Sequence, residues 1–382
     1  MDSTTARTTL AALIDAVSAS LLERADEVRL AAITAIAGHH TVMIGKPGVA
    51  KSKMARALSS GLSGARYFEL LMARGTETSE LFGSKDIEAM KAGRGRRVLD
   101  GTAVDAEVVF LDEAFKAHSA ILNALLGVLN ERRYTNGADG VVKVPLRFAI
   151  VASNEVPDEG DASLAPFYDR FLTRMHVVEL QDDASFARLM RGDFGPTPVG
   201  VSSLEALDFA REESRRVALS DGAIAALRAV VVACRQRGVD VSDRRAVAIG
   251  DFLRATAWLD GRSVVDAGDV GVIAPCLWSR LDQIATVEEI VRQHAPSWQN
   301  DARDIRRVLV EQRDAIRHAG RHKTLEAAVA ALQPIARVLK DLDGDVAAKV
   351  KPLAADAARD LAREVQAVRD ELTRATAEAY AR

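Results

Sequence analysis

The sequence predicts an α/β fold with a parallel five-stranded sheet between helices, followed by two regions that are entirely helical. Short apolar runs of strand length alternate with helical patterns from residue 1 to about residue 195. This alternation is typical of βαβ units, and several runs are apolar on both faces, as central parallel strands are. Beyond that point no strand alternation is evident in the sequence, and helical patterns follow one another.

Length, composition and charge limit the class of protein. The chain has 382 residues, of which 48% are hydrophobic and 27% are charged, a balance typical of a soluble protein with two or three domains. Its net charge of −3 does not indicate a nucleic-acid partner. No apolar run approaches the roughly 20 residues that span a bilayer, and the N-terminus lacks the features of a signal peptide. We therefore expect a cytoplasmic protein without membrane insertion.

Five apolar runs are the expected strands of the sheet. They comprise residues 41–44, 66–71, 108–111, 146–152 and 175–180. Helical patterns accompany them at residues 21–36, 51–62 and 118–131. Together these elements predict a nucleotide-binding type of α/β domain over residues 1–195.

The rest of the chain divides into two helical regions. A Gly- and Pro-rich stretch ends the first domain, and a helical domain is expected over residues 196–283, with Ser220 and Ser242 as helix caps. Residues 284–382 predict a helical appendage, a hairpin or a bundle, because apolar residues repeat at helical spacing. These residues are Leu353, Leu361, Val365, Val368 and Leu372, and residues 341–345 are the expected turn before them.

A phosphate-binding loop is predicted at residues 45–52 (GKPGVAKS), between an expected strand and an expected helix. Backbone N–H groups and the helix N-terminus create positive potential for phosphate oxygens there. Lys51 would bridge the β- and γ-phosphates of a nucleotide, and the Ser52 hydroxyl would ligate Mg²⁺. Ala50 stands where the strict pattern has Gly, so we expect a helix-like backbone there rather than a strongly positive φ. The alternative is a Gly/Pro turn with an incidental Lys-Ser pair.

A second motif follows about 60 residues later, at residues 108–113 (VVFLDE). Asp112 would hold Mg²⁺ and Glu113 would polarise the attacking water, because acids at the carboxyl end of a parallel strand face the ligand crevice. A strand followed by an acidic helix start is the alternative. The two motifs together predict binding and hydrolysis of ATP with Mg²⁺. The expected nucleotide contacts are Gly45, Pro47, Gly48, Val49, Ala50, Lys51, Ser52, Lys53 and Asp112.

Over roughly residues 20–280 the chain resembles the MoxR family of AAA+ ATPases, and most closely its RavA branch. The resemblance rests on the phosphate loop and on the segments TSELFG, FLDEAFKA, ILNALLGVLNER, IVASNEVP and YDRFLTR. It implies an AAA+ core with an all-α lid, assembled into a ring of identical subunits that we expect to be a hexamer. It also implies ATP-driven remodelling, maturation or activation of a protein client, often one with a von Willebrand factor A domain.

The resemblance also implies roles for polar residues outside the two motifs. Asn154 corresponds to sensor 1, which orients the attacking water; an Asn-capped loop is the alternative. Arg170 corresponds to the arginine finger, which reaches the γ-phosphate of a neighbouring subunit, and Arg174 is a second candidate one helical turn later. Arg244, which fits better than Arg245, corresponds to sensor 2, which reads phosphate from the lid of the same subunit. Surface ion pairing is the alternative for these arginines.

Two further segments resemble insertions that distinguish this group of ATPases. Residues 88–105 resemble the helix-2 insert, and residues 132–146 resemble the hairpin before sensor 1, with an Asn-Gly turn signal. In related machines such elements face the pore of the ring. A basic cluster in the first segment would therefore touch a substrate or form a solvated loop. Its members are Lys91, Arg94, Arg96 and Arg97.

Two other functions remain open from the sequence. A nucleotide-gated scaffold would use ATP to set assembly, with incidental turnover, although the intact Glu113 argues against it. A DNA-dependent motor is disfavoured by the acidic total charge.

Overall fold

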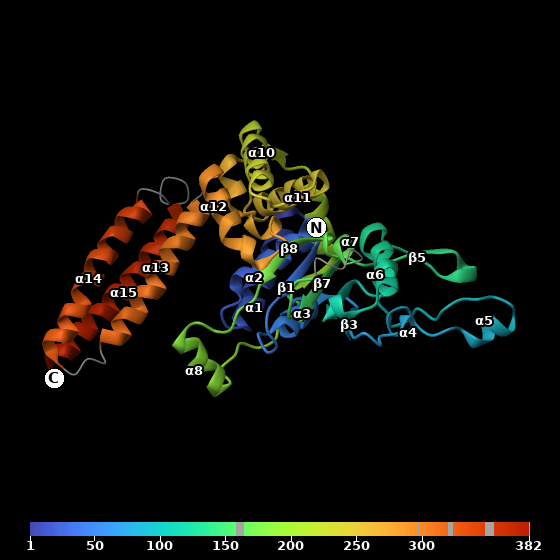
Figure 1. Ribbon diagram of the computed structural model, residues 1–382, viewed down its shortest axis with the longest axis horizontal. Helices are drawn as coiled ribbons and strands as arrows, with labels where there is room; N and C mark the ends of the chain where they lie inside the picture. Colours follow the sequence, from blue (N-terminus) through green and yellow to red (C-terminus); the bar gives the residue numbers. More distant parts are fainter. Residues whose placement is uncertain (158–163, 296–297, 320–323, 348–354, 382) are drawn as a thin grey trace. The chain divides into compact units, whose positions relative to one another are not determined.

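The computed structural model describes residues 1–157, 164–295, 298–319, 324–347 and 355–381. It divides into two compact units, the first formed by residues 1–267 and 273–290 and the second by residues 268–272 and 291–382. The first unit contains the central sheet and the helices around it, and the second contains three long helices (Figure 1). In the described part of the chain, no helix combines the length and the apolar character that a membrane crossing requires.

The central sheet has five strands in the order β3-β4-β7-β1-β8, and all neighbouring pairs are parallel (Figure 1). This arrangement confirms the predicted fold class. Since parallel neighbours cannot be joined by tight turns, the chain crosses over through helices between them. The strands are β1 (His40–Ile44), β3 (Tyr67–Leu71), β4 (Val108–Asp112), β7 (Phe148–Ser153) and β8 (Phe171–His176).

The last strand of the sheet was predicted at residues 175–180 but lies at Phe171–His176. Two polar residues inside this strand interrupt the apolar pattern by which a strand is predicted. The Thr173 hydroxyl is buried and lies 2.8 Å from that of Thr41, which satisfies its hydrogen bonding. Arg174 is buried as well, and its guanidinium donates to backbone and hydroxyl oxygens of a neighbouring segment. Buried polar side chains are tolerated where such partners exist.

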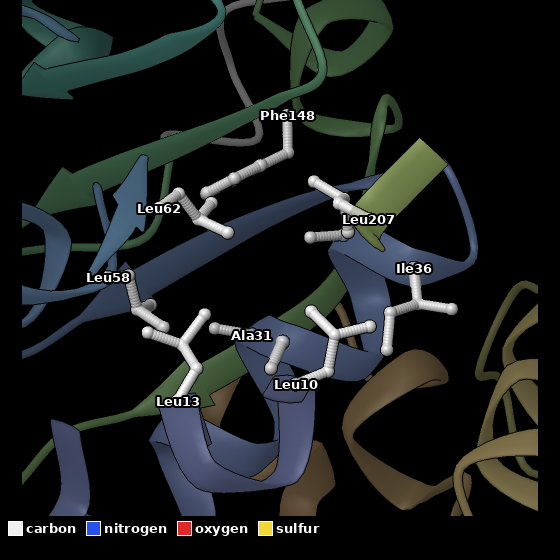
Figure 2. A pocket seen from close by; sticks show the side chains of 10 residues that line it. Leu10, Leu13, Ala31, Ile36, Leu58, Leu62, Phe148 and Leu207 are labelled. Carbon is white, nitrogen blue, oxygen red and sulfur yellow. The ribbon is translucent and has the colours of Figure 1, made fainter. Parts of the chain in front are cut away.

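Helices from both ends of the first unit meet around one apolar cluster. They are α1 (Ser3–Ala19), α2 (Ala25–Ile36), α3 (Lys51–Ser60) and α9 (Leu204–Ser214). Figure 2 shows their side chains converging with Phe148 around a cavity of about 20 Å³. Leu10 of α1 and Leu207 of α9 are both buried in this cluster. The first helix after the predicted domain boundary therefore packs on the N-terminal helices.

The remaining helices of the region that resembles a lid are α10 (Asp221–Gln236), α11 (Asp243–Leu259) and α12 (Ile284–His294). The predicted caps are confirmed: Ser220 Oγ accepts from the Ala223 amide and Ser242 Oγ accepts from the Arg245 amide, each 3.1–3.2 Å away. Such bonds satisfy amides that lack partners in the first turn of a helix.

Buried contacts of Arg245 fasten α11 to the start of β8. Its side chain donates to Asp169 Oδ1 at 2.9 Å and to the carbonyl oxygen of Cys276 at 3.1 Å. Arg245 is 5% exposed, whereas its neighbour Arg244 is exposed. The guanidinium of Arg245 is therefore a structural group that holds the lid region against the sheet.

Shorter elements complete the first unit. The helices are α4 (Thr78–Phe82), α5 (Ile87–Lys91), α6 (Ser119–Leu126), α7 (Ala165–Tyr168) and α8 (Asp183–Arg191), with a π-helical turn at Gly127–Glu131. The short strands are β2 (Leu62–Ser63), β5 (Arg133–Thr135), β6 (Val141–Lys143), β9 (Ser202–Ser203), β10 (Ala218–Leu219) and β11 (Val264–Val265). Short 3-10 turns of this unit lie at Ala114–Lys116, Gly137–Asp139, Ala274–Cys276 and Leu281–Gln283, whereas the one at Ala267–Val272 belongs mostly to the second unit.

The second unit is built from α13 (Trp298–Ala319), α14 (Leu325–Asp345) and α15 (Ala355–Ala381), which lie side by side (Figure 1). The predicted stripe of Leu361, Val365, Val368 and Leu372 is buried in their common apolar core, and Leu353 lies outside the described residues. The turn predicted at residues 341–345 is wrong, because α14 continues through them. Apolar Leu342 is buried there, so packing outweighs the poor helix propensity of the neighbouring Asp and Gly residues.

Substitutions of the adjacent residues Arg244 and Arg245 test whether Arg245 holds the lid region against the sheet. We expect Arg245→Ala to lower the free energy of unfolding by about 2–3 kcal/mol, because it leaves Asp169 and several carbonyls without their donor. Arg244→Ala is the matched control and should change it by less than about 0.5 kcal/mol, since this side chain is exposed. Urea unfolding followed by tryptophan fluorescence measures both. Equal effects of the two substitutions would contradict the structural role of Arg245.

Candidate functional site

Three predicted segments meet at the carboxyl edge of the sheet. The phosphate loop follows β1, the acid pair ends β4, and Asn154 follows β7. The parallel register aligns Ile44 with Ser153 and Asp112 with Ala152, so these strands end together. In an open α/β sheet, ligands bind in the crevice outside these ends. The structure thus brings the predicted loop and the predicted acids to one place.

The phosphate loop has a backbone that only some residues can adopt. A Cβ atom at Gly45 would clash with the carbonyl oxygen of Val177, so this position requires glycine. Gly48 has a φ of 88°. Ala50 also lies in the left-handed region, with φ 69° and ψ 23°, and the expected helix-like backbone there is wrong. The closed loop imposes this conformation on alanine at a cost of about 1–2 kcal/mol.

Lys51 is the buried cation of the site, with 7% of its surface exposed. Its Nζ donates to the carbonyl oxygens of Gly45 and Lys46 and, at 3.1 Å, to Asn154 Oδ1. Burial lowers the pKa of Lys51, and the carboxylates of Asp112 and Glu113 act in the opposite direction. A buried ammonium whose other partners are neutral oxygens is well suited to gain an anionic one.

The acid pair is held in a strained turn at the end of β4. Asp112 Oδ1 accepts from the Glu113 amide at 3.0 Å, and Glu113 has a φ of 53°. The Glu113 side chain forms an ion pair with Lys116 at 3.2 Å. Left-handed residues other than glycine cluster at functional sites, where the fold compensates for the strain.

The oxygen donors near the loop fit a magnesium ion. Ser52 lies in the first turn of α3, and the Asp112 carboxylate lies at the same edge of the sheet. Mg²⁺ prefers such hard oxygen ligands and keeps several waters or phosphate oxygens. No group of three or more His, Cys, Asp and Glu side chains among the described residues is arranged to hold a metal. A magnesium ion here would therefore take its other ligands from phosphate and water.

A large apolar pocket of about 540 Å³ adjoins the phosphate loop and was missed by the sequence analysis. One wall is the loop itself, from Pro47 to Ala50 with Lys53, and Leu21 and Leu22 line another. The third wall is α8 with Phe186 and Leu189, which lie at helical spacing after an N-cap aspartate. The N-cap aspartate followed by apolar residues at helical spacing is the sequence signal from which this helix could have been predicted. The pocket is placed to take the base of a nucleotide whose phosphates lie on the loop.

Arg170 lies at the opposite edge of the sheet. It directly precedes Phe171, which pairs with His40 at the amino end of β1. The loop starts five residues further along that strand, about 16 Å away at 3.3 Å per residue. Burial lowers the pKa of Arg170, and Arg244 lowers it further. Its Nε is buried without a hydrogen-bond partner in the described part of the chain. Arg170 is thus remote from its own phosphate loop.

The expectation for Arg174 is contradicted. It was placed one helical turn after Arg170, but it lies inside β8 and is 2% exposed. Its guanidinium donates to the carbonyl oxygen of Trp278 and to Ser279 Oγ, and it stacks 4.3 Å from the centre of the Tyr168 ring. These contacts use the guanidinium within its own subunit, so Arg174 cannot serve as a second finger in this conformation.

Arg244, the expected sensor 2 residue, lies in the first turn of α11. This exposed residue begins α11, whose next residue is bonded to Asp169, and it is close enough to Arg170 to lower its pKa. It therefore lies at the amino edge of the sheet. In this conformation Arg244 lies near Arg170 rather than beside its own phosphate loop, and its role as sensor 2 stays a prediction.

The two predicted insert segments are joined by the buried side chain of Asn136, which is 3% exposed. It accepts from the Arg97 amide at 2.8 Å and donates to the Arg97 carbonyl oxygen at 3.1 Å. Phe82 and Tyr134 stack beside this contact, with ring centres 5.1 Å apart. The helix-2 segment and the β5–β6 hairpin are thus connected.

The predicted basic cluster divides between bonded and exposed members. Arg96 forms an ion pair with Asp86 at 2.8 Å, and Arg97 donates to the Gly83 carbonyl oxygen at 2.6 Å. Lys91 and Arg94 are exposed. Half of the cluster is therefore engaged in holding the insert together.

Comparisons with known proteins agree with this geometry. A family model described as the MoxR domain in the MoxR-vWA-beta-propeller ternary systems matches residues 8–195, and an AAA lid domain matches residues 221–291. Two uncharacterized proteins of Methanocaldococcus jannaschii are similar. One is 37% identical over 271 residues, covering 71% of this chain and 70% of the relative. The other is 36% identical over 267 residues, covering 70% of each chain.

A solved structure supports the fold. The crystal structure titled a "putative ATPase" from Cytophaga hutchinsonii has a TM-score of 0.62 and covers 76% of this chain and 95% of that chain. At 21% identity, this likeness bears on the fold alone. The MoxR domain match together with the AAA lid match identifies the chain as a member of the MoxR family of AAA+ ATPases.

Proposed function

We propose that this protein binds ATP with Mg²⁺, hydrolyses it, and uses the turnover to remodel, mature or activate a partner protein. The observation that carries the proposal is the buried Lys51 ammonium, which lies among loop carbonyls beside Asn154 and near the acid pair. A site built in this way favours a triphosphate over neutral ligands. Membership of the AAA+ family supports the same substrate.

Each residue of the site has a distinct task in this proposal. Lys51 holds the β- and γ-phosphates, while Ser52 and Asp112 hold the metal ion. Mg²⁺ supplies positive charge that offsets the charge of the phosphates. Glu113 accepts the proton of the attacking water as general base. Asn154 orients that water, and its bond to Lys51 fixes the amide between the loop and the acids.

The catalytic set is completed by a neighbouring subunit. Arg170 and Arg244 lie together at the amino edge, away from their own phosphate loop. The mutual repulsion of the two cations favours an anion from outside the subunit. The γ-phosphate of the next subunit supplies such an anion in a ring, which we propose to be a hexamer.

The partner is a protein, and a von Willebrand factor A domain protein is the first candidate. The matching family model is described as the MoxR domain in MoxR-vWA-beta-propeller ternary systems, which supports this candidate. Membership of the RavA branch and a cytoplasmic location of the protein stay predictions.

Substitutions in the phosphate loop test nucleotide binding. We expect Lys51→Ala to weaken Mg-ATP binding at least about 100-fold, because Lys51 is the buried cation of residues 45–52. Lys46→Ala is the matched control in the same loop; its side chain is 76% exposed and pairs with Glu179, so affinity should change little. Calorimetric titration measures both, with melting temperatures as a check of folding. Wild-type affinity in Lys51→Ala would remove the loop from the proposal.

Mixed oligomers test whether the finger acts between subunits. Glu113→Gln and Arg170→Ala should each bind ATP but lose turnover, because one lacks the base and the other the cation for the transition state. Mixed at equal amounts, they should recover up to about a quarter of wild-type turnover, since about a quarter of the interfaces then pair an intact acid with an intact arginine. Phosphate release is the measurement.

The control for this experiment is each variant alone under the same conditions. If light scattering shows that mixed oligomers form but turnover stays at the level of the single variants, Arg170 does not act across the interface. Normal turnover by Arg170→Ala alone would exclude it from catalysis.

A further inference from the structure

The helix α8 (Asp183–Arg191) buries none of its nine residues. Its apolar side chains nevertheless lie on one face: Phe186 is 54% exposed, Leu189 is 38% exposed and Met190 is 65% exposed. A helix this short is not stable by itself and normally depends on packing of such a face. The apolar face of α8 therefore lacks the packing partner that such a face normally has.

Both ends of α8 are nevertheless fixed to the neighbourhood of the phosphate loop. At its start, the Glu23 carboxylate accepts from the amides of Gln181 and Asp182 at 2.8 and 3.0 Å. After its end, Lys53 lies over the ring of Phe194 at 4.1 Å. The helix is thus tethered at two points, while its apolar face between them borders open space.

That open space is the 540 Å³ pocket beside the phosphate loop. Phe186 and Leu189 line it opposite the loop, whereas Met190 does not. The nearby acids are already engaged, since Glu179 pairs with Lys46 at 2.8 Å and Glu23 accepts from the Gln181 amide. The pocket therefore offers a flat, apolar partner a place, and an aromatic base attached to phosphates on the loop fits that description.

We propose that α8 is a strap which the base of the bound nucleotide closes, with Phe186 packing on the base. The inference rests on the proposed function. It adds that the nucleoside part of the nucleotide, and not the triphosphate, orders α8. The strap precedes β9 (Ser202–Ser203), which pairs with β2 and leads directly into α9. Closing of the strap thus acts on the connection between the core and the helical lid.

Paired ligands and paired variants test the strap. Mg-ATP and Mg-tripolyphosphate are titrated against wild type, Phe186→Ala and the control Met190→Ala. Phe186→Ala should weaken ATP binding about tenfold, the size of a lost base–aromatic contact, and leave tripolyphosphate binding unchanged. Met190→Ala should bind both ligands as the wild type does. Both positions are exposed, so the fold should be retained, and melting temperatures check this.

Hydrogen exchange gives a second readout. In the wild type, ATP should slow exchange of the amides at residues 183–191, and tripolyphosphate should not; Phe186→Ala should lose this protection. The inference is overturned if the two ligands protect α8 equally, or if Phe186→Ala binds ATP as Met190→Ala does. Both outcomes leave Lys51-dependent ATP binding intact, whereas a wild type that binds neither ligand overturns the proposed function itself.

Discussion

The parallel alignment of β1 with its neighbours β7 and β8 is the constraint on which the rest of the structure depends. Because the strands run the same way, their carboxyl ends place the loop after Ile44, the acid at Asp112 and the amide at Asn154 at one edge. The same alignment sends Arg170, which precedes its strand, to the other edge. This alignment thus gathers most of the proposed nucleotide site at one edge of the sheet and places Arg170, the proposed finger, at the other edge.

Local strain shows that the site is shaped by its tertiary surroundings. Ala50 and Glu113 both lie in the left-handed region, although neither is glycine. The first position closes the loop before Lys51, and the second turns the chain so that a carboxylate follows the strand end. Each costs about 1–2 kcal/mol, which the buried strands on either side offset. Residue propensity alone predicted the wrong backbone at Ala50 for this reason.

The sequence revealed the parts of the fold whose residue pattern matches their burial. Four strands were found because they are apolar, while β8 was displaced because Thr173 and Arg174 are polar yet buried with partners. The loop and acid pair could be found because their chemistry lies in adjacent residues. The pocket of α8 could not, since its walls come from three separate segments. Likewise, no local sequence pattern predicts against which edge of the sheet the start of α11 packs.

The position of the start of α11 determines how the lid region would contribute to the proposed hydrolysis. Arg245 is buried and holds Asp169, so the residues next to them, Arg244 and Arg170, belong to one connected body. A shift of α11 would therefore move both cations together rather than one against the other. Since α9 of the same region packs on α1 and α2 beside the sheet, a change at the nucleotide edge has a packed route to the arginine edge. In the proposed ring, coupling between the nucleotide sites of neighbouring subunits would run through these contacts within one subunit.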